Sequence, residues 1–136
     1  MSVIKKISKT DFIDFINSKA FEGITIGDDK EKIIKYLKNK KYKCIYGKDF
    51  IVIKYCNVEF TIDKDNKIVL IHFDLSEFIS EIGYLFEPLS FEEIKEEIEK
   101  NMIEIKQGIF DDQLIISNKC KLFFENKKLI DIYIIE

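Results

Sequence analysis

The sequence predicts an α+β fold built from two tandem repeats, each with two helices followed by an antiparallel meander, forming one sheet with the helices on one face. Three observations predict it. Residues 50–73 alternate between apolar and polar side chains as strands do, and the pattern returns over residues 114–134. Helical spacing of apolar residues precedes both stretches, and a repeat of this length is typical of a duplicated architecture.

The first strand-rich stretch predicts a hairpin. Residues 64–67, Lys-Asp-Asn-Lys, supply turn chemistry, since Asp and Asn tolerate a left-handed backbone. The connection is too short for a parallel crossover, so the strands are antiparallel. The side chains expected on the buried face are Val58, Phe60 and Ile62 before the turn and Val69, Ile71 and Phe73 after it.

The second stretch repeats this hairpin with a shorter turn at residues 126–128. A slip of one residue would move every apolar side chain to the opposite face of the sheet. The apolar side chains occupy matching alternate positions in the two copies, which supports the repeat. The side chains expected to be buried here are Cys120, Leu122 and Phe124, followed by Ile130, Ile132 and Ile134.

Helices are expected before each meander. In the first repeat, one is predicted over residues 10–17 with Thr10 as its cap, and another begins at Asp28, which has the capping-box spacing to Glu31. In the second repeat, residues 77–82 parallel residues 11–16, and Ser90 with Glu93 forms another capping box. The chain is therefore expected to form a single domain, 1–136, with repeats at about 8–74 and 75–136.

Two such units join most simply edge to edge, which covers two open strand edges and leaves one sheet face without helices. Alternation places aromatic, aliphatic and charged side chains together on that face, as on surfaces that bind other proteins. The alternative is that a further element covers this face. The side chains projected onto it are Glu59, Thr61, Asp63, Leu70 and His72 from the first unit, and Lys121, Phe123, Glu125, Asp131 and Tyr133 from the second.

The charge of the chain is divided unevenly. Residues 1–74 hold 15 Lys and 11 acidic residues, a net of +4, whereas residues 75–136 hold 7 Lys and 14 acidic residues, a net of −7. An acidic half can steer a basic protein partner to its site. Asp111 and Asp112 in the turn at 108–113, together with Asp131, are candidate contacts, while the acidic run at 92–99 also fits the solvated side of a helix.

No motif for catalysis, metal binding or a cofactor is present. His72 has no nucleophile at a recognisable spacing, and the three cysteines lack the CxxC pattern, so buried reduced thiols are expected. All 22 basic residues are lysine, and the absence of arginine disfavours a reader of nucleic acid. No apolar stretch has the length of a signal peptide or membrane span, so a soluble cytoplasmic protein without membrane association is expected.

Two tandem units of helix, loop, helix and sheet resemble the architecture of beta-lactamase inhibitor protein. Residues 23–33, Gly-Ile-Thr-Ile-Gly-Asp-Asp-Lys-Glu-Lys-Ile, are similar to the Gly-x-Ser/Thr-x-Glu-x-Val helix start of that inhibitor and of outer-membrane-assembly lipoproteins with the same unit fold. The chain is expected to depart from these families, because its sequence shows no export signal, no paired cysteines and no cysteine for acylation. The resemblance implies a scaffold whose helix-free sheet face binds another protein.

A small, acidic, lysine-rich chain without catalytic motifs also resembles immunity proteins of bacterial toxin systems, which act in bacterial competition. We therefore expect a non-enzymatic inhibitor that binds and neutralises a cognate toxin domain, such as a basic nuclease. The alternative is a non-catalytic structural or small-ligand-binding module, which a deep apolar pocket between helices and sheet would favour. The candidate partner-binding residues are Glu59, His72, Asp111, Asp112, Phe123, Asp131 and Tyr133.

Overall fold

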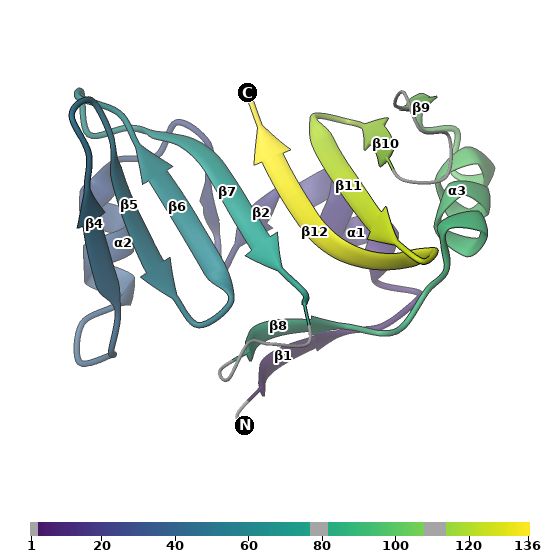
Figure 1. The fold of residues 1–136 in the computed structure, drawn as a ribbon, viewed down its shortest axis with the longest axis horizontal. Coiled ribbons are helices and arrows are strands. Elements are labelled where there is room, and N and C mark those ends of the chain that lie inside the picture. Colours follow the sequence, from purple (N-terminus) through teal and green to yellow (C-terminus); the bar gives the residue numbers. More distant parts are fainter. Residues whose placement is uncertain (1–2, 77–81, 108–113) are drawn as a thin grey trace.

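The computed structural model describes residues 3–76, 82–107 and 114–136 and shows an α+β fold around an eight-stranded sheet (Figure 1). All neighbouring strands of this sheet are antiparallel, in the order β4-β5-β6-β7-β12-β11-β10-β9. The strands are β4 (Lys43–Tyr46), β5 (Ile51–Tyr55), β6 (Val58–Ile62), β7 (Ile68–Asp74), β9 (Ile105–Gln107), β10 (Leu114–Ser117), β11 (Cys120–Glu125) and β12 (Lys128–Ile135).

The two meanders meet at the centre of the sheet, where β7 pairs with β12. His72 lies opposite Tyr133 in this pair, and Ile71 lies opposite Ile134. The prediction that the two meanders join edge to edge into one sheet is confirmed. The next strands outward from this seam are β6 on one side and β11 on the other.

A bulge in each hairpin changes which residues are buried on the return strand. The register shifts between Thr61 and Ile62 in the first hairpin, and at the equivalent point of the second hairpin, between residues 123 and 124. The predictions that Val69 and Ile130 are buried are therefore wrong, because each bulge turns the preceding residue inward in its place. The residues buried on the return strands are Ile68, Ile71 and Phe73, and Leu129, Ile132 and Ile134.

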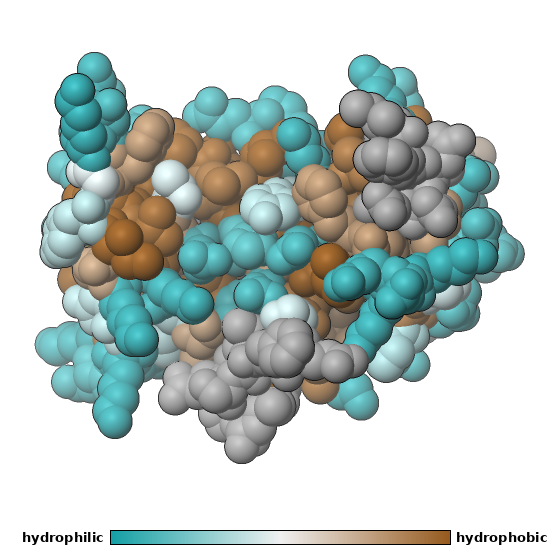
Figure 2. All heavy atoms as spheres, viewed as in Figure 1, coloured by the Kyte–Doolittle hydropathy of each residue, from teal (hydrophilic) through white to brown (hydrophobic). Residues whose placement is uncertain are grey.

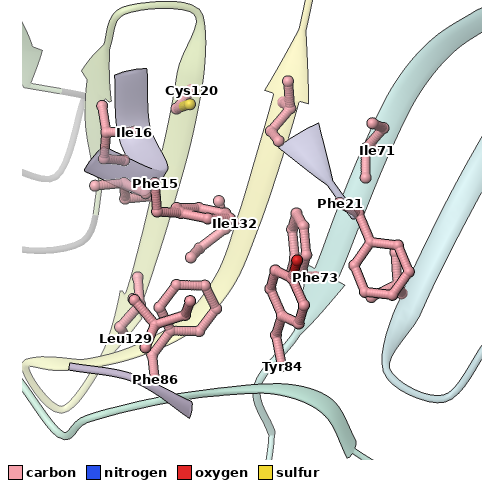
Figure 3. Close-up of a cluster of buried hydrophobic side chains, with 14 of the residues drawn as sticks. Phe15, Ile16, Phe21, Ile71, Phe73, Tyr84, Phe86, Cys120, Leu129 and Ile132 are labelled. Carbon is pink, nitrogen blue, oxygen red and sulfur yellow. The ribbon is translucent and has the colours of Figure 1, made fainter. Parts of the chain in front are cut away.

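The described residues form three helices, α1 (Phe12–Ser18), α2 (Lys30–Tyr36) and α3 (Phe91–Lys100). In Figure 1, α1 and α2 lie behind the sheet and α3 lies beside its β9 end. Within the described ranges, none of them is long and apolar enough to cross a membrane. Their buried side chains and the inward side chains of the strands form one core, part of which is drawn in Figure 3.

An aromatic cluster fills the centre of this core. Phe21 is fully buried, and its ring centroid lies 4.7 Å from that of Tyr84 and 5.8 Å from that of Phe60. Phe21 belongs to a short hairpin of β2 (Ala20–Phe21) and β3 (Ile24–Thr25). This hairpin therefore carries the chain from α1 to α2 and also supplies a central core residue.

The second half differs from its predicted two-helix form. The helix expected over residues 77–82 is contradicted at Ile82, which begins β8 (Ile82–Phe86), while residues 77–81 lie outside the described part of the chain. β8 pairs in parallel with β1 (Val3–Ile7). The five-residue run of β8 is largely apolar without helical spacing, so a strand that finds a partner in β1 is its favoured state. The described residues of this half contain one helix, α3.

Asn57 ties the β1–β8 ribbon to the sheet. It lies in the turn between β5 and β6 and is 1% exposed. Its side-chain oxygen accepts hydrogen bonds from the backbone N–H groups of Gly83 and Tyr84, and its amide nitrogen donates to the backbone oxygens of Asp74 and Tyr84. One buried side chain thus satisfies four backbone groups, on Asp74 of the sheet and on Gly83 and Tyr84 of β8.

Helix ends were predicted with mixed success. The capping box of α3 is confirmed, because Ser90 accepts from the Glu93 N–H and Glu93 accepts from the Ser90 N–H. The caps of the first two helices are each displaced by one residue. Asp11 occupies the position predicted for Thr10, and Asp29 the position predicted for Asp28. Asp28 instead accepts from the Thr25 N–H and pairs with Lys32.

The cysteines differ in accessibility, which gives a direct test of the fold. All three are free thiols, and Cys120 is buried whereas Cys44 and Cys56 are partly exposed. Burial raises the pKa of Cys120 to about 12, so very little of it is the reactive thiolate at pH 8. We expect an alkylating reagent at pH 8 to label Cys44 and Cys56 at least about tenfold faster than Cys120. Peptide mass spectrometry measures the alkylation rate of each cysteine. In the control, urea unfolds the protein and the three rates become equal. Equal rates in the native protein would contradict the burial of Cys120.

Candidate protein-binding face

The face of the sheet opposite the helices carries five of the seven predicted partner-binding residues. Side chains at paired positions of antiparallel strands point to the same face, so the strand register defines this surface. One row runs from Glu59 on β6 through His72 on β7 to Tyr133 on β12. Asp131 and Phe123 lie opposite each other in the neighbouring row. The structure therefore brings together residues that are up to 74 positions apart in the sequence.

His72 links the two halves of the sheet through two carboxylates. Its Nδ1 lies 2.8 Å from Oε1 of Glu59, and its Nε2 lies 2.7 Å from Oδ1 of Asp131. Asp131 reaches the ring from a diagonal position on β12, two residues from Tyr133. An ionised carboxylate only accepts hydrogen bonds, so both contacts are satisfied together when both ring nitrogens carry a proton.

The histidine also stacks on an aromatic side chain. The rings of His72 and Tyr133 are 4.3 Å apart and inclined by 4°, and Phe123 packs edge-on against Tyr133 at 5.5 Å. Partial burial, followed by the negative charges of Asp131 and Glu59, raises the pKa of Tyr133. The phenol is therefore neutral at physiological pH and can donate a hydrogen bond.

The carboxylates at the centre of the face have capacity for further contacts. Glu59 and Asp131 each use one oxygen on His72, and in the described part of the chain neither forms an ion pair with a lysine. Asp74, which lies opposite Asp131, uses one oxygen to accept from the Ser76 N–H. Lysines flank this centre, with Lys54 opposite Glu59 and Lys121 opposite Tyr133. The charge pattern is thus acidic in the middle and basic on both sides.

A second row on this face is mainly apolar. It crosses from β4 to β12 through residues at successive paired positions. Figure 2 shows hydrophilic atoms gathered at the centre of the face and hydrophobic atoms on either side of them. The members of this apolar row are Ile45, Val52, Thr61, Leu70 and Ile135.

The sequence prediction included part of this surface and missed part of it. Leu70 and Thr61 were projected onto the face, whereas Ile45, Val52 and Ile135 were not considered. Extending the alternation of β6 into β5, β4 and β12 is the signal that could have found them. Asp111 and Asp112, the other two predicted contacts, lie outside the described residues.

The arrangement offers binding chemistry. Both ring nitrogens of His72 are engaged by carboxylates, and among the described residues no hydroxyl or thiol forms a hydrogen bond with the ring. Over residues 3–76, 82–107 and 114–136, no group of three or more His, Cys, Asp or Glu side chains is positioned to hold a metal ion. Aromatic rings, aliphatic side chains and partly buried carboxylates are the groups that protein interfaces use.

Comparison with protein families, with curated proteins and with solved structures finds no match to this chain. The resemblance to beta-lactamase inhibitor protein and to immunity proteins therefore stays a prediction from the sequence. The properties of the sheet face are the basis for a functional proposal.

Proposed function

We propose that this chain is an inhibitory protein-binding module, an immunity protein that binds and neutralises a cognate toxin domain. The observation that carries the proposal is the helix-free sheet face, which presents an apolar row beside the cluster of Glu59, His72, Asp131 and Tyr133. An inhibitor of this kind acts by covering the active site or substrate groove of its target. The proposal assigns no catalytic step, metal or cofactor to the chain.

The scaffold suits a broad contact surface. In this proposal the two halves are tandem repeats, and the matching bulges at Val69 and Ile130 support that interpretation. The β7–β12 seam joins the halves into one sheet, and the helices stabilise it from behind. A partner then meets a face held by packing on its other side, which limits the entropy lost on binding.

The proposed partner is a basic protein domain. The carboxylates of Glu59, Asp131 and Asp74 lie at the centre of the face, and the half of the chain from residue 75 carries a net charge of −7. Complementary charge raises the rate of association and disfavours wrong partners. A toxin that acts on nucleic acid has a basic substrate groove, and an acidic surface fits such a groove.

We place the protein in the cytoplasm, where free thiols persist because the compartment is reducing. The proposal includes no nucleic-acid partner and no membrane association. The alternative function is a structural or small-ligand-binding module. An enclosed cavity of about 150 Å³ lies beside Leu75, Phe86 and Leu129, and it is small against the roughly 300–1,000 Å³ typical of ligand pockets. Larger hollows, of about 530 Å³ along α2 and about 540 Å³ beside Asn118, are open grooves at the surface. The sheet face is therefore the better-supported site.

The first test is a pull-down of the tagged protein with the C-terminal domain encoded by the neighbouring gene, analysed by native mass spectrometry. A one-to-one complex that survives moderate salt and abolishes the activity of that domain is the expected result. Absence of a complex, together with a small molecule that copurifies with the chain, would replace this proposal by the ligand-binding alternative.

The double variant Glu59→Gln with Asp131→Asn is expected to weaken that complex. It removes two charges from the centre of the face while preserving side-chain volume. We expect Kd to rise at least about tenfold and its dependence on salt to become shallower. Titration calorimetry at several salt concentrations measures both quantities.

The matched control is Glu96→Gln with Glu99→Gln, which removes two charges from the exposed side of α3. This variant has the same net charge as the first, so long-range attraction changes equally in both. Thermal unfolding of both variants verifies that the sheet is intact. Equal affinity of the two variants would exclude the central carboxylates as the contact site.

A further inference from the structure

The outer strand β4 has a free backbone edge. Among the described residues it is the terminal strand of the eight-stranded sheet and pairs on one side only, with β5. The Gly47 N–H donates to the Phe50 oxygen, so these two residues form a hydrogen-bonded pair next to the turn. Hydrogen-bonded and non-hydrogen-bonded pairs alternate along an antiparallel ladder, so Ile45 is the next residue of β4 whose N–H and C=O groups bond to β5. The backbone N–H and C=O groups of Cys44 and Tyr46 therefore point away from the sheet.

Large apolar side chains gather at the same edge. Ile45 is 56% exposed and Tyr46 is 73% exposed, although both belong to a strand of the main sheet. Tyr42 before the strand and Phe50 after the turn are also exposed. Elsewhere in the described ranges, the exposed large apolar residues are Leu85 and Met102. An edge that combines free backbone groups with exposed apolar side chains is a template for another strand.

A groove lies beside this edge, along the end of α2. It has a volume of about 530 Å³, and Ile34, Leu37 and Tyr42 supply apolar atoms to its wall. Lys35, Lys38 and Lys40 line the same groove. A strand added next to β4 points every second side chain toward the helix side of the sheet, where this groove lies.

The charge around the edge determines which strand fits. Residues 30–48 contain eight lysines and one acidic residue, Glu31. In the described structure, Lys32 is the member of this group that forms an ion pair, with Asp28. Pairing of two β4 edges would place two lysine-rich segments against each other, and such repulsion is a known protection against self-association. An acidic segment meets complementary charge instead.

We propose that β4 accepts an added strand from an acidic, extended segment of a partner protein. Main-chain hydrogen bonds to Cys44 and Tyr46 supply the pairing, and the lysines beside the groove select acidic side chains. This edge is separate from the cluster around His72, and the inference does not depend on the proposed function. The two sites can therefore be tested, and can fail, independently.

A blocked heptapeptide in which glutamate or aspartate alternates with valine is the probe. Hydrogen exchange of the full chain, followed by NMR, is measured with and without it. We expect exchange of the Cys44 and Tyr46 amides to slow at least about tenfold, and exchange of the Ile45 amide to change little because it already bonds to β5. Protection without this alternation, or no protection, would overturn the proposal.

Two control peptides separate strand pairing from simple charge attraction without altering the protein. A peptide with N-methyl groups on the amides that face β4 keeps its charges but cannot complete the ladder, and a peptide with lysine in place of the acidic residues cannot complement the edge. Both are expected to bind at least about tenfold more weakly than the probe. Binding of the N-methylated peptide as tight as that of the probe would overturn the strand-addition mechanism.

Variants of Tyr46 test strand pairing by altering the protein instead of the peptide. Tyr46→Pro removes an outward N–H group at an edge position that tolerates proline, whereas Tyr46→Ala removes the side chain and retains that N–H. We expect the proline variant to lose at least about tenfold in affinity for the probe and the alanine variant to lose less than about threefold, with thermal unfolding confirming both folds. The proposal would be overturned if the two variants lost affinity equally. It would also be overturned if this edge bound a single-stranded oligonucleotide in preference to the probe, or if the free chain dimerised through β4.

Discussion

Replacing Asn57 with alanine is expected to destabilise the protein by about 4 kcal/mol, because a buried unsatisfied hydrogen-bonding group costs about 1–3 kcal/mol and this change affects several at once. The side chain is 1% exposed and satisfies backbone groups of Asp74, Gly83 and Tyr84. Removing it leaves two donors and two acceptors without this partner. Urea unfolding followed by circular dichroism measures the loss.

Asn57→Asp distinguishes hydrogen bonding from packing, since it keeps the volume and the accepting oxygen. The new carboxylate faces the carbonyl oxygens of Asp74 and Tyr84, which cannot donate to it, so burial raises its pKa in the folded state. A raised pKa makes the neutral acid the compatible form. The variant should therefore be closest to the native protein below about pH 4, the pKa of the unfolded chain, and lose stability as the pH rises through the folded-state value. A variant as stable as the native protein at pH 8 would contradict this role.

Phe21→Ala is the second large effect, with an expected loss of about 3–5 kcal/mol. Phe21 is fully buried in the aromatic cluster, in contact with side chains from α2, β6, β7 and β8. Alanine removes the ring and leaves a cavity that these neighbours cannot close completely. Calorimetric or urea unfolding at pH 7 measures the change.

Two controls accompany this substitution. Phe21→Leu keeps most of the buried volume and is expected to cost less than half as much as the alanine variant. Phe50→Ala removes the same ring from a position that is 51% exposed and is expected to cost less than about 1 kcal/mol. Similar losses for Phe21→Ala and Phe50→Ala would mean that the short β2–β3 hairpin does not anchor the core.

Alternation predicted the hairpins and their buried sides well, because burial of one face imposes a period of two on the sequence. It could not predict the bulges, since the extra residue depends on how the turn is held. In the first turn, Asp63 Oδ1 accepts from the N–H groups of Asp65 and Lys67, and the chain re-enters the sheet with Ile68 inward. Such a contact leaves no periodic signal in the sequence.

The ribbon of β1 and β8 was missed for another reason. Ile82 to Phe86 is a short, mostly apolar run, and periodicity alone does not separate a buried strand from a helix segment of that length. Its strand state depends on β1, about 80 residues away, and on the hydrogen bonds that Gly83 and Tyr84 donate to Asn57. Only tertiary structure supplies those partners.

The candidate protein-binding face also could not be predicted in full from alternation. Alternation placed His72 and Tyr133 on one side of their strands, but a shift of two residues in the β7–β12 pairing preserves that side. Tyr133 could then have faced Leu70 or Asp74 instead of His72. The contacts of His72 with Glu59 and Asp131 follow from the register in the structure, which alternation cannot select.

The position of β12 at the centre of the sheet has a consequence for the order of events during synthesis. β4 to β7 leave the ribosome as a complete meander, but the strand that pairs with β7 is made last of the eight, more than 50 residues later. Until then, β7 is an open edge that carries His72 and residues that are buried in the folded protein, such as Ile71. At synthesis rates of about 5–20 residues per second, that edge stays available for several seconds. During this interval it can pair with the β12 of another newly made chain, so crowding of nascent chains favours exchange of strands between copies.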